Sequence, residues 1–153
     1  SNAMQISPGV QFTIFTNANP TISTNIAQTA PSASLVKTGT GTLILTGANT
    51  YSGGTTIVEG TLSLQGGGSL VSTAPVTVGT AGTVTSATFA ISSNTTIGDL
   101  SGSSKGSILL DVNQLTFGTS ASMAFAGVIS GNGINGSILK VGTGVETFTN
   151  ANT

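Results

Sequence analysis

Short runs in which apolar residues alternate with small or polar ones recur along the whole chain. The runs at 61–65 and 88–91 show this most clearly, because Leu62, Leu64, Phe89 and Ile91 stand at every second position. Such alternation predicts short β-strands with one buried face. The period of an amphipathic helix is absent from the sequence. Similar runs lie at 42–46, 76–78, 114–117 and 122–125.

Glycine-rich turns separate these runs, and the predicted strand centres fall roughly every ten residues, a spacing that suits a β-sandwich or a β-solenoid. Narrow coils favour slim aliphatic residues inside and Thr or Ser outside, which is what this chain has. Amide side chains near corners can bond to the backbone or to one another along a stack of coils. Asparagines near predicted corners are Asn49, Asn94, Asn113 and Asn132.

The composition argues against several classes of function. Thr, Ser, Asn and Gly make up 80 of the 153 residues. The net charge is −1, with only three basic residues, so the phosphates of a nucleic acid have no basic patch to bind. The absence of histidine and cysteine removes thiol nucleophiles, disulfides and the usual zinc ligands. We therefore predict no catalytic, metal or cofactor-binding residue, and no enzyme.

An internal repeat strengthens the solenoid prediction. Residues 35–50 and 138–153 align without gaps at an offset of 103, and eight of the sixteen positions are identical. A unit of 103 residues is too long for one coil, so we expect several coils of roughly 20–30 residues each. The identical positions include Lys37 and Lys140, for which we predict a structural role rather than ligand binding.

The stretch at 35–64, LVKTGTGTLILTGANTYSGGTTIVEGTLSL, resembles the autotransporter-associated β-strand repeat of Gram-negative autotransporter passengers. Residues 97–102 and 125–131 resemble the segments between repeats and before the next one. The second copy departs from the pattern, because Val145 and Glu146 replace Thr42 and Leu43, and Asn150 replaces Gly47.

This resemblance implies a right-handed parallel β-helix, exported by type V secretion and displayed at the cell surface or released. It also implies that a C-terminal outer-membrane barrel anchors the parent chain. We expect a tag remnant at 1–3, a lead-in or cap at 4–21, and a single β-solenoid domain at 22–153. That domain would hold about one and a half copies of the unit.

Few side chains are candidates for chemistry. The acids are Glu59, Asp99, Asp111 and Glu146. Asp99 and Asp111 are the two that could come close across adjacent coils and act as an acid–base pair, but solvated or turn-bonding acids are the expected role.

The sequence at 131–136 fits G-x-G-x-x-G, but the strand-like residues after it favour a β-helix corner over a dinucleotide site. Tyr51 is expected to pack within its turn. The sequons at Asn94 and Asn135 are expected by chance in so Asn- and Thr-rich a chain.

The sequence therefore predicts a structural or adhesive passenger segment. Its partners would be host-surface or extracellular-matrix molecules, or further copies of itself, and not nucleic acid. Two alternatives stay open at this stage. One is a fragment of a carbohydrate-active β-helix enzyme, a lyase or hydrolase, and the other is a β-sandwich adhesin domain.

Overall fold

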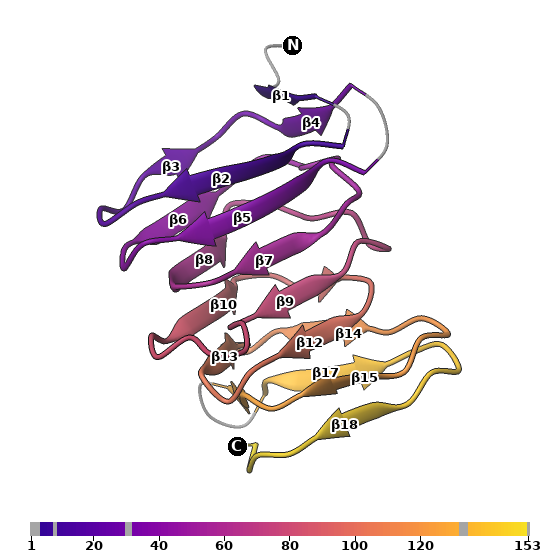
Figure 1. Cartoon of the computed structure of the whole chain (residues 1–153). Helices are drawn as coiled ribbons and strands as arrows, with labels where there is room; N and C mark the ends of the chain where they lie inside the picture. Colours follow the sequence, from indigo (N-terminus) through magenta and orange to yellow (C-terminus); the bar gives the residue numbers. More distant parts are fainter. Residues whose placement is uncertain (1–3, 8, 30–31, 132–134, 153) are drawn as a thin grey trace.

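The computed structural model describes residues 4–7, 9–29, 32–131 and 135–152. In this part of the chain every regular element is a β-strand, and the strands pair in parallel. The chain winds into a β-solenoid of about six turns, with its two ends at opposite ends of the stack (Figure 1). The predicted parallel β-solenoid is confirmed. The β-sandwich alternative is wrong, because a sandwich is built from antiparallel sheets.

Each coil passes through three faces in turn. In the described ranges, the third face carries strands only toward the two ends of the stack. These are β1 (Met4–Ile6) with β4 (Ile26–Gln28), and β11 (Thr95–Thr96) with β14 (Gln114–Phe117) and β17 (Ser137–Lys140). The seven-stranded face contains β2 (Gln11–Phe15), β5 (Ser34–Thr38), β7 (Thr55–Ile57), β9 (Val76–Val78), β12 (Leu100–Gly102), β15 (Met123–Phe125) and β18 (Glu146–Phe148). The six-stranded face contains β3 (Thr21–Ile22), β6 (Thr42–Leu45), β8 (Gly60–Leu64), β10 (Ala87–Ile91), β13 (Gly106–Leu109) and β16 (Val128–Ser130).

The core consists of rows in which successive coils place an apolar residue at the same position. The central row of the six-stranded face runs from coil to coil through the described strands and is buried throughout. Thr42, Thr61, Thr88 and Ser107, which alternate with it, form an outer row on the same strands. The predicted burial of one apolar face is therefore confirmed. The buried row consists of Leu43, Leu62, Phe89, Ile108 and Ile129.

The coils differ in length. Thr42 pairs with Thr61, 19 positions later, whereas Thr61 pairs with Thr88, 27 positions later. The longer spacing includes the turn between β9 and β10. Residues 4–21, expected to be a lead-in or cap, contain β1, β2 and the first residue of β3, and these three strands pair with strands of the next coil. The domain division itself stays a prediction.

The corner asparagines connect neighbouring coils. The Asn49 side chain accepts a hydrogen bond from the Ile26 amide at 2.9 Å and donates to the Ser69 carbonyl at 3.0 Å, so it binds the coils on both sides. Asn94 accepts from the Gln114 amide at 2.9 Å. Asn113 donates to the Ile91 carbonyl at 3.3 Å. The expected bonding of corner amides to backbone is therefore confirmed at these three positions, while Asn132 lies outside the described residues.

The two repeat copies fold alike but lie on different faces. At the offset of 103, β5 corresponds to β17 and β6 corresponds to β18. However, β5 belongs to the seven-stranded face and β17 to the third face, while β6 belongs to the six-stranded face and β18 to the seven-stranded face. A displacement of 103 residues therefore covers four whole turns and two further faces. As a result, corresponding side chains of the two copies point in different directions around the solenoid.

Candidate functional site

The first candidate is the turn between β5 and β6, which contains Lys37, the only charged residue that is buried among the described residues. Lys37 is completely buried among the described residues. Its ammonium group donates to the carbonyls of Thr38 at 3.0 Å, Gly39 at 2.7 Å and Glu59 at 3.0 Å. An ammonium has three hydrogens and no acceptor, so three carbonyls satisfy it. Burial lowers the pKa of Lys37, and the nearby Glu59 charge partly opposes this.

Glycines make room for this arrangement. Gly39 has φ of +79° and Gly60 has φ of +70°, a region that side chains disfavour. A Cβ atom at Gly60 would also collide with the Gly39 and Gly41 carbonyl oxygens and lie 2.9 Å from the Lys37 ammonium. The glycines of the Lys-x-Gly-x-Gly segment and the Glu-Gly that follows therefore let two coils close around one lysine.

The second copy repeats the turn. The Lys140 ammonium donates to the Val141 carbonyl and, at 3.4 Å, to the Gly142 carbonyl, and Gly142 has φ of +70°. The predicted structural role of the repeated lysines is supported by these contacts. In both turns the charged end of the lysine side chain donates to backbone carbonyls.

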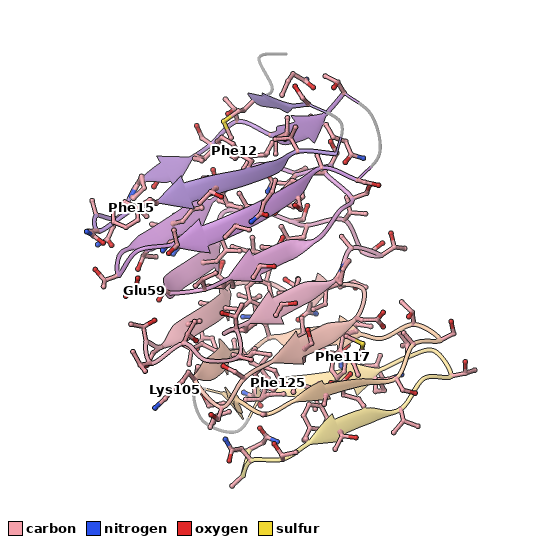
Figure 2. The ribbon with its side chains drawn as sticks, in the orientation of Figure 1. Phe12, Phe15, Glu59, Lys105, Phe117 and Phe125 are labelled. Atoms are coloured by element: carbon pink, nitrogen blue, oxygen red, sulfur yellow. The ribbon has the colours of Figure 1, made fainter. Side chains whose placement is uncertain are left out.

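A cleft of about 490 Å³ adjoins the first turn on its solvent side. Glu59, which lies between β7 and β8 and is labelled in Figure 2, is one of the residues that line this cleft. Val84 of the β9–β10 turn is 86% exposed there. Sequence reasoning did not find this cleft, because residues from two distant turns form it. Its other lining residues are Thr40, Gly60, Thr61, Thr85, Ser86 and Thr88.

Asp99 and Asp111, the possible acid–base pair, lie at different corners and have different surroundings. Asp99 accepts hydrogen bonds from the Thr119 amide at 2.9 Å and the Thr119 hydroxyl at 2.8 Å, which ties it to the next coil. Asp111 follows β13, on a different corner, has φ of +52° and is exposed. It borders a smaller hollow that Leu109, Ser130 and Gly131 complete. Asp99 and Asp111 therefore do not form a shared acid–base site in this arrangement.

Glu146 is the most perturbed acid. It stands where the first copy has Leu43, and its Oε1 atom is buried without a hydrogen-bond partner among the described residues. Burial raises the pKa of Glu146 to about 7, the Lys140 charge lowers it, and the Asp99 charge raises it. A carboxylate in an inward position of β18 therefore costs stability when it is ionised.

We expect this cost to appear as a pH dependence of unfolding. The folded-state pKa of Glu146 is about 7 and its ordinary value is 4.5, so the folded protein holds the proton more tightly. The free energy of unfolding should be highest below pH 4.5 and should fall as the pH rises through 7. Urea denaturation followed by circular dichroism at pH 5 and pH 8 measures the difference. Glu146→Gln should remove most of it, whereas Glu59→Gln should retain it; equal pH dependence in both variants would contradict the assignment.

The other motifs have local roles. Tyr51 is buried, its hydroxyl lies 2.8 Å from the Thr55 hydroxyl, and burial raises its pKa, so it packs within the turn as expected. In the G-x-G-x-x-G segment, residues 132–134 lie outside the described part of the chain, but the strand β17 follows it rather than a helix. The sequon residues Asn94 and Asn135 are exposed.

No group of three or more Asp or Glu side chains that could hold a metal ion occurs in the described ranges. Within the same ranges, no helix has the length and apolar character needed to cross a membrane.

Comparison with protein families gives one match. Residues 35–64, which contain the Lys37 turn, β5 to β8 and Tyr51, match the family model described as passenger-associated-transport-repeat. Residues 35–64 are thus similar to a passenger-associated transport repeat. This repeat and the parallel β-solenoid together fit an autotransporter passenger domain with β repeats, as the sequence resemblance implied. No curated protein and no solved structure gave a significant match.

The passenger repeat covers the best-buried part of the solenoid. Its lysine, its Asn49 corner and its Tyr51 turn each bond one coil to another or close a turn. The side chains that recur in the repeat thus serve coil stacking.

Proposed function

We propose that this segment is a non-catalytic structural section of a passenger that is displayed at the cell surface or secreted, and that its cleft side is adhesive. The observation that carries the structural part is that polar side chains bond one coil to the next. Lys37, Asn49 and Asp99 each bond to a neighbouring coil, so they stabilise the stack. The resulting rod is suited to hold other parts of a passenger away from a membrane.

The adhesive part concerns the cleft beside Glu59. The cleft combines one carboxylate with the hydroxyls of Thr40, Thr61, Thr85 and Ser86 and an exposed Val84 side chain. Such a surface offers hydrogen-bond acceptors and donors around a small apolar contact, as polar interfaces do. Host-surface or extracellular-matrix molecules are the proposed partners, with self-association as the alternative source of adhesion.

Display and adhesion are tested separately. The segment is placed between a secretion signal and an outer-membrane anchor and carries an epitope tag, and surface labelling is measured by flow cytometry. We expect the unaltered segment to be displayed and Leu62→Asp, which places a charge in the buried row, to lose display. Equal display of both would contradict the link between coil stacking and export.

Adhesion is measured with the purified chain on immobilised matrix proteins and on host cells. We expect saturable binding that weakens in Glu59→Gln/Val84→Ser. Lys105→Gln is the control, because Lys105 lies outside the cleft lining. Absence of binding to every surface would contradict the adhesive proposal and leave the structural one, and substrate turnover by the purified chain would contradict the non-catalytic one.

A further inference from the structure

Three polar side chains form a column at the corner between the seven-stranded and the six-stranded face, in the middle of the stack. The Gly60 amide donates to the Ser86 carbonyl at 3.0 Å, and the Ala87 amide donates to the Lys105 carbonyl at 3.1 Å. Glu59 directly precedes Gly60, and Ser86 directly precedes Ala87. The strand register therefore stacks Glu59, Ser86 and Lys105 on three successive coils.

The two ends of this column have opposite charges. Glu59 and Lys105 are the only charged residues that the described turns between these two faces contain. Neighbouring strands lie about 4.8 Å apart, so two coils separate the charges by about 10 Å. The Lys105 side chain is exposed and points away from the solenoid (Figure 2). The Lys37 ammonium is held by the Glu59 carbonyl, so the Glu59 carboxylate stays available to a partner.

The turn between β9 and β10 extends beside the middle of the column. It spans the eight residues 79–86, whereas the other described turns at this corner have two to five residues. Unusually long turns are where binding residues concentrate in folds of short connections. Val84, two residues before Ser86, is 86% exposed. The column therefore has a negative end, an apolar contact near its midpoint and a positive end.

We propose that this corner is an interface between two antiparallel copies of the chain, related by a two-fold axis that passes near Ser86. The axis brings Glu59 of each copy opposite Lys105 of the other, so two ion pairs form together. It also brings the two Val84 side chains close to each other between these pairs. A parallel arrangement is disfavoured, because it sets like charges opposite each other. The inference rests on the adhesive role proposed for the cleft side and names a second copy as the partner.

The choice of a second copy follows from charge complementarity. The corner has one acid and one base, so neither a polyanion nor a polycation matches it. A second copy presents the same two charges in reverse order and at the same spacing. The surface is small, and we expect a Kd of about 0.1–1 mM for the isolated chain. Many copies held on one surface would bind more tightly through avidity.

Sedimentation velocity over a range of concentrations measures this self-association. Glu59→Lys and Lys105→Glu each set like charges opposite one another at both ends of the column, and each should weaken association by about tenfold or more. Ser93→Lys adds a positive charge at the exposed turn between β10 and β11, on another corner, and should leave association unchanged. Equal association of the Glu59→Lys, Lys105→Glu and unaltered chains would overturn the interface.

Mixing the two charge variants tests the antiparallel arrangement and confirms that both are folded. In the mixed pair the introduced lysine faces the introduced glutamate, and the native Lys105 faces the native Glu59. We therefore expect the mixture to associate about as tightly as the unaltered chain, although neither variant does so alone. The double variant Glu59→Lys/Lys105→Glu should likewise pair with itself. Lack of recovery in both cases would overturn the proposal.

Lys105→Gln separates this interface from the binding of matrix molecules. It removes one partner from both ion pairs, and we expect self-association to weaken by about tenfold. Binding to immobilised matrix proteins should not change, because Lys105 lies outside the cleft lining. Unchanged self-association in Lys105→Gln would overturn the interface between copies. That result would leave the proposed binding of matrix molecules, which is measured with dilute chain, unaffected.

Discussion

Replacing Lys37 by methionine should destabilise the solenoid by about 2–4 kcal/mol, because three buried or partly buried carbonyls lose a charge-assisted hydrogen bond at once. Methionine fills a similar volume and keeps the aliphatic stem, so the loss reports on the ammonium rather than on a cavity. Some of the loss is offset, since the desolvation of a buried charge disappears with it. Urea denaturation at pH 7 followed by circular dichroism measures the change.

Two further variants show whether position or charge is responsible. Lys105→Met removes an exposed lysine on the same solenoid and should change the free energy of unfolding by less than about 0.5 kcal/mol. Lys140→Met removes a lysine with the same local turn but no third carbonyl among the described residues, and it should cost less than Lys37→Met. Equal costs for Lys37 and Lys140 would contradict the importance of the bond from one coil to the next.

Much of the fold follows from local sequence. The alternating runs at 61–65 and 88–91 become β8 and β10, with Leu62, Leu64 and Phe89 buried as the period of two requires. The turns that connect strands contain glycine at positive φ, as at Gly39 and Gly79. These features depend only on residues that are neighbours in the sequence, so they can be predicted from the sequence alone.

The placement of the second copy could not be predicted in the same way. The repeat at an offset of 103 predicts that the residues near Lys37 and Lys140 have the same local structure. The two turns confirm this, because each lysine ammonium donates to a carbonyl of its own turn. Which face each copy occupies depends on the summed length of all the coils between them. Because the spacing between successive strands varies from 19 to 27 residues on one face alone, the displacement of the second copy by two faces depends on the whole stack.

The contacts of the candidate sites could be predicted from the sequence only in part, for a similar reason. The repeat marks Lys37 and Lys140 as structural, but nothing in the sequence shows that the Lys37 ammonium reaches the Glu59 carbonyl, 22 positions later. The substitution of Leu43 by Glu146 is visible in the alignment of the copies. Its electrostatic setting, with Asp99 and Lys140 nearby, depends on stacking between coils. Such contacts become apparent once the strand register is known.

The largest loss of stability is expected for Phe89→Ala. Phe89 is fully buried in the middle of the stack, where β10 pairs with β8 on one side and with β13 on the other. Removing most of a buried phenylalanine side chain costs about 3–5 kcal/mol, since both the transfer free energy and the cavity contribute. In a stacked-coil protein each coil contacts only its neighbours, so a central defect weakens two interfaces together.

The matched control is Phe15→Ala, which removes the same side chain from the first coil, where it is 67% exposed (Figure 2). We expect a change below about 1 kcal/mol there, because little apolar surface leaves the core. Urea denaturation followed by circular dichroism, with hydrogen exchange of the β8 and β13 amides, measures both effects. Faster exchange on both sides of β10 in Phe89→Ala would show that the coils depend on one another. A loss confined to β10 would show instead that each coil is stable by itself, which would contradict stabilisation through the buried row.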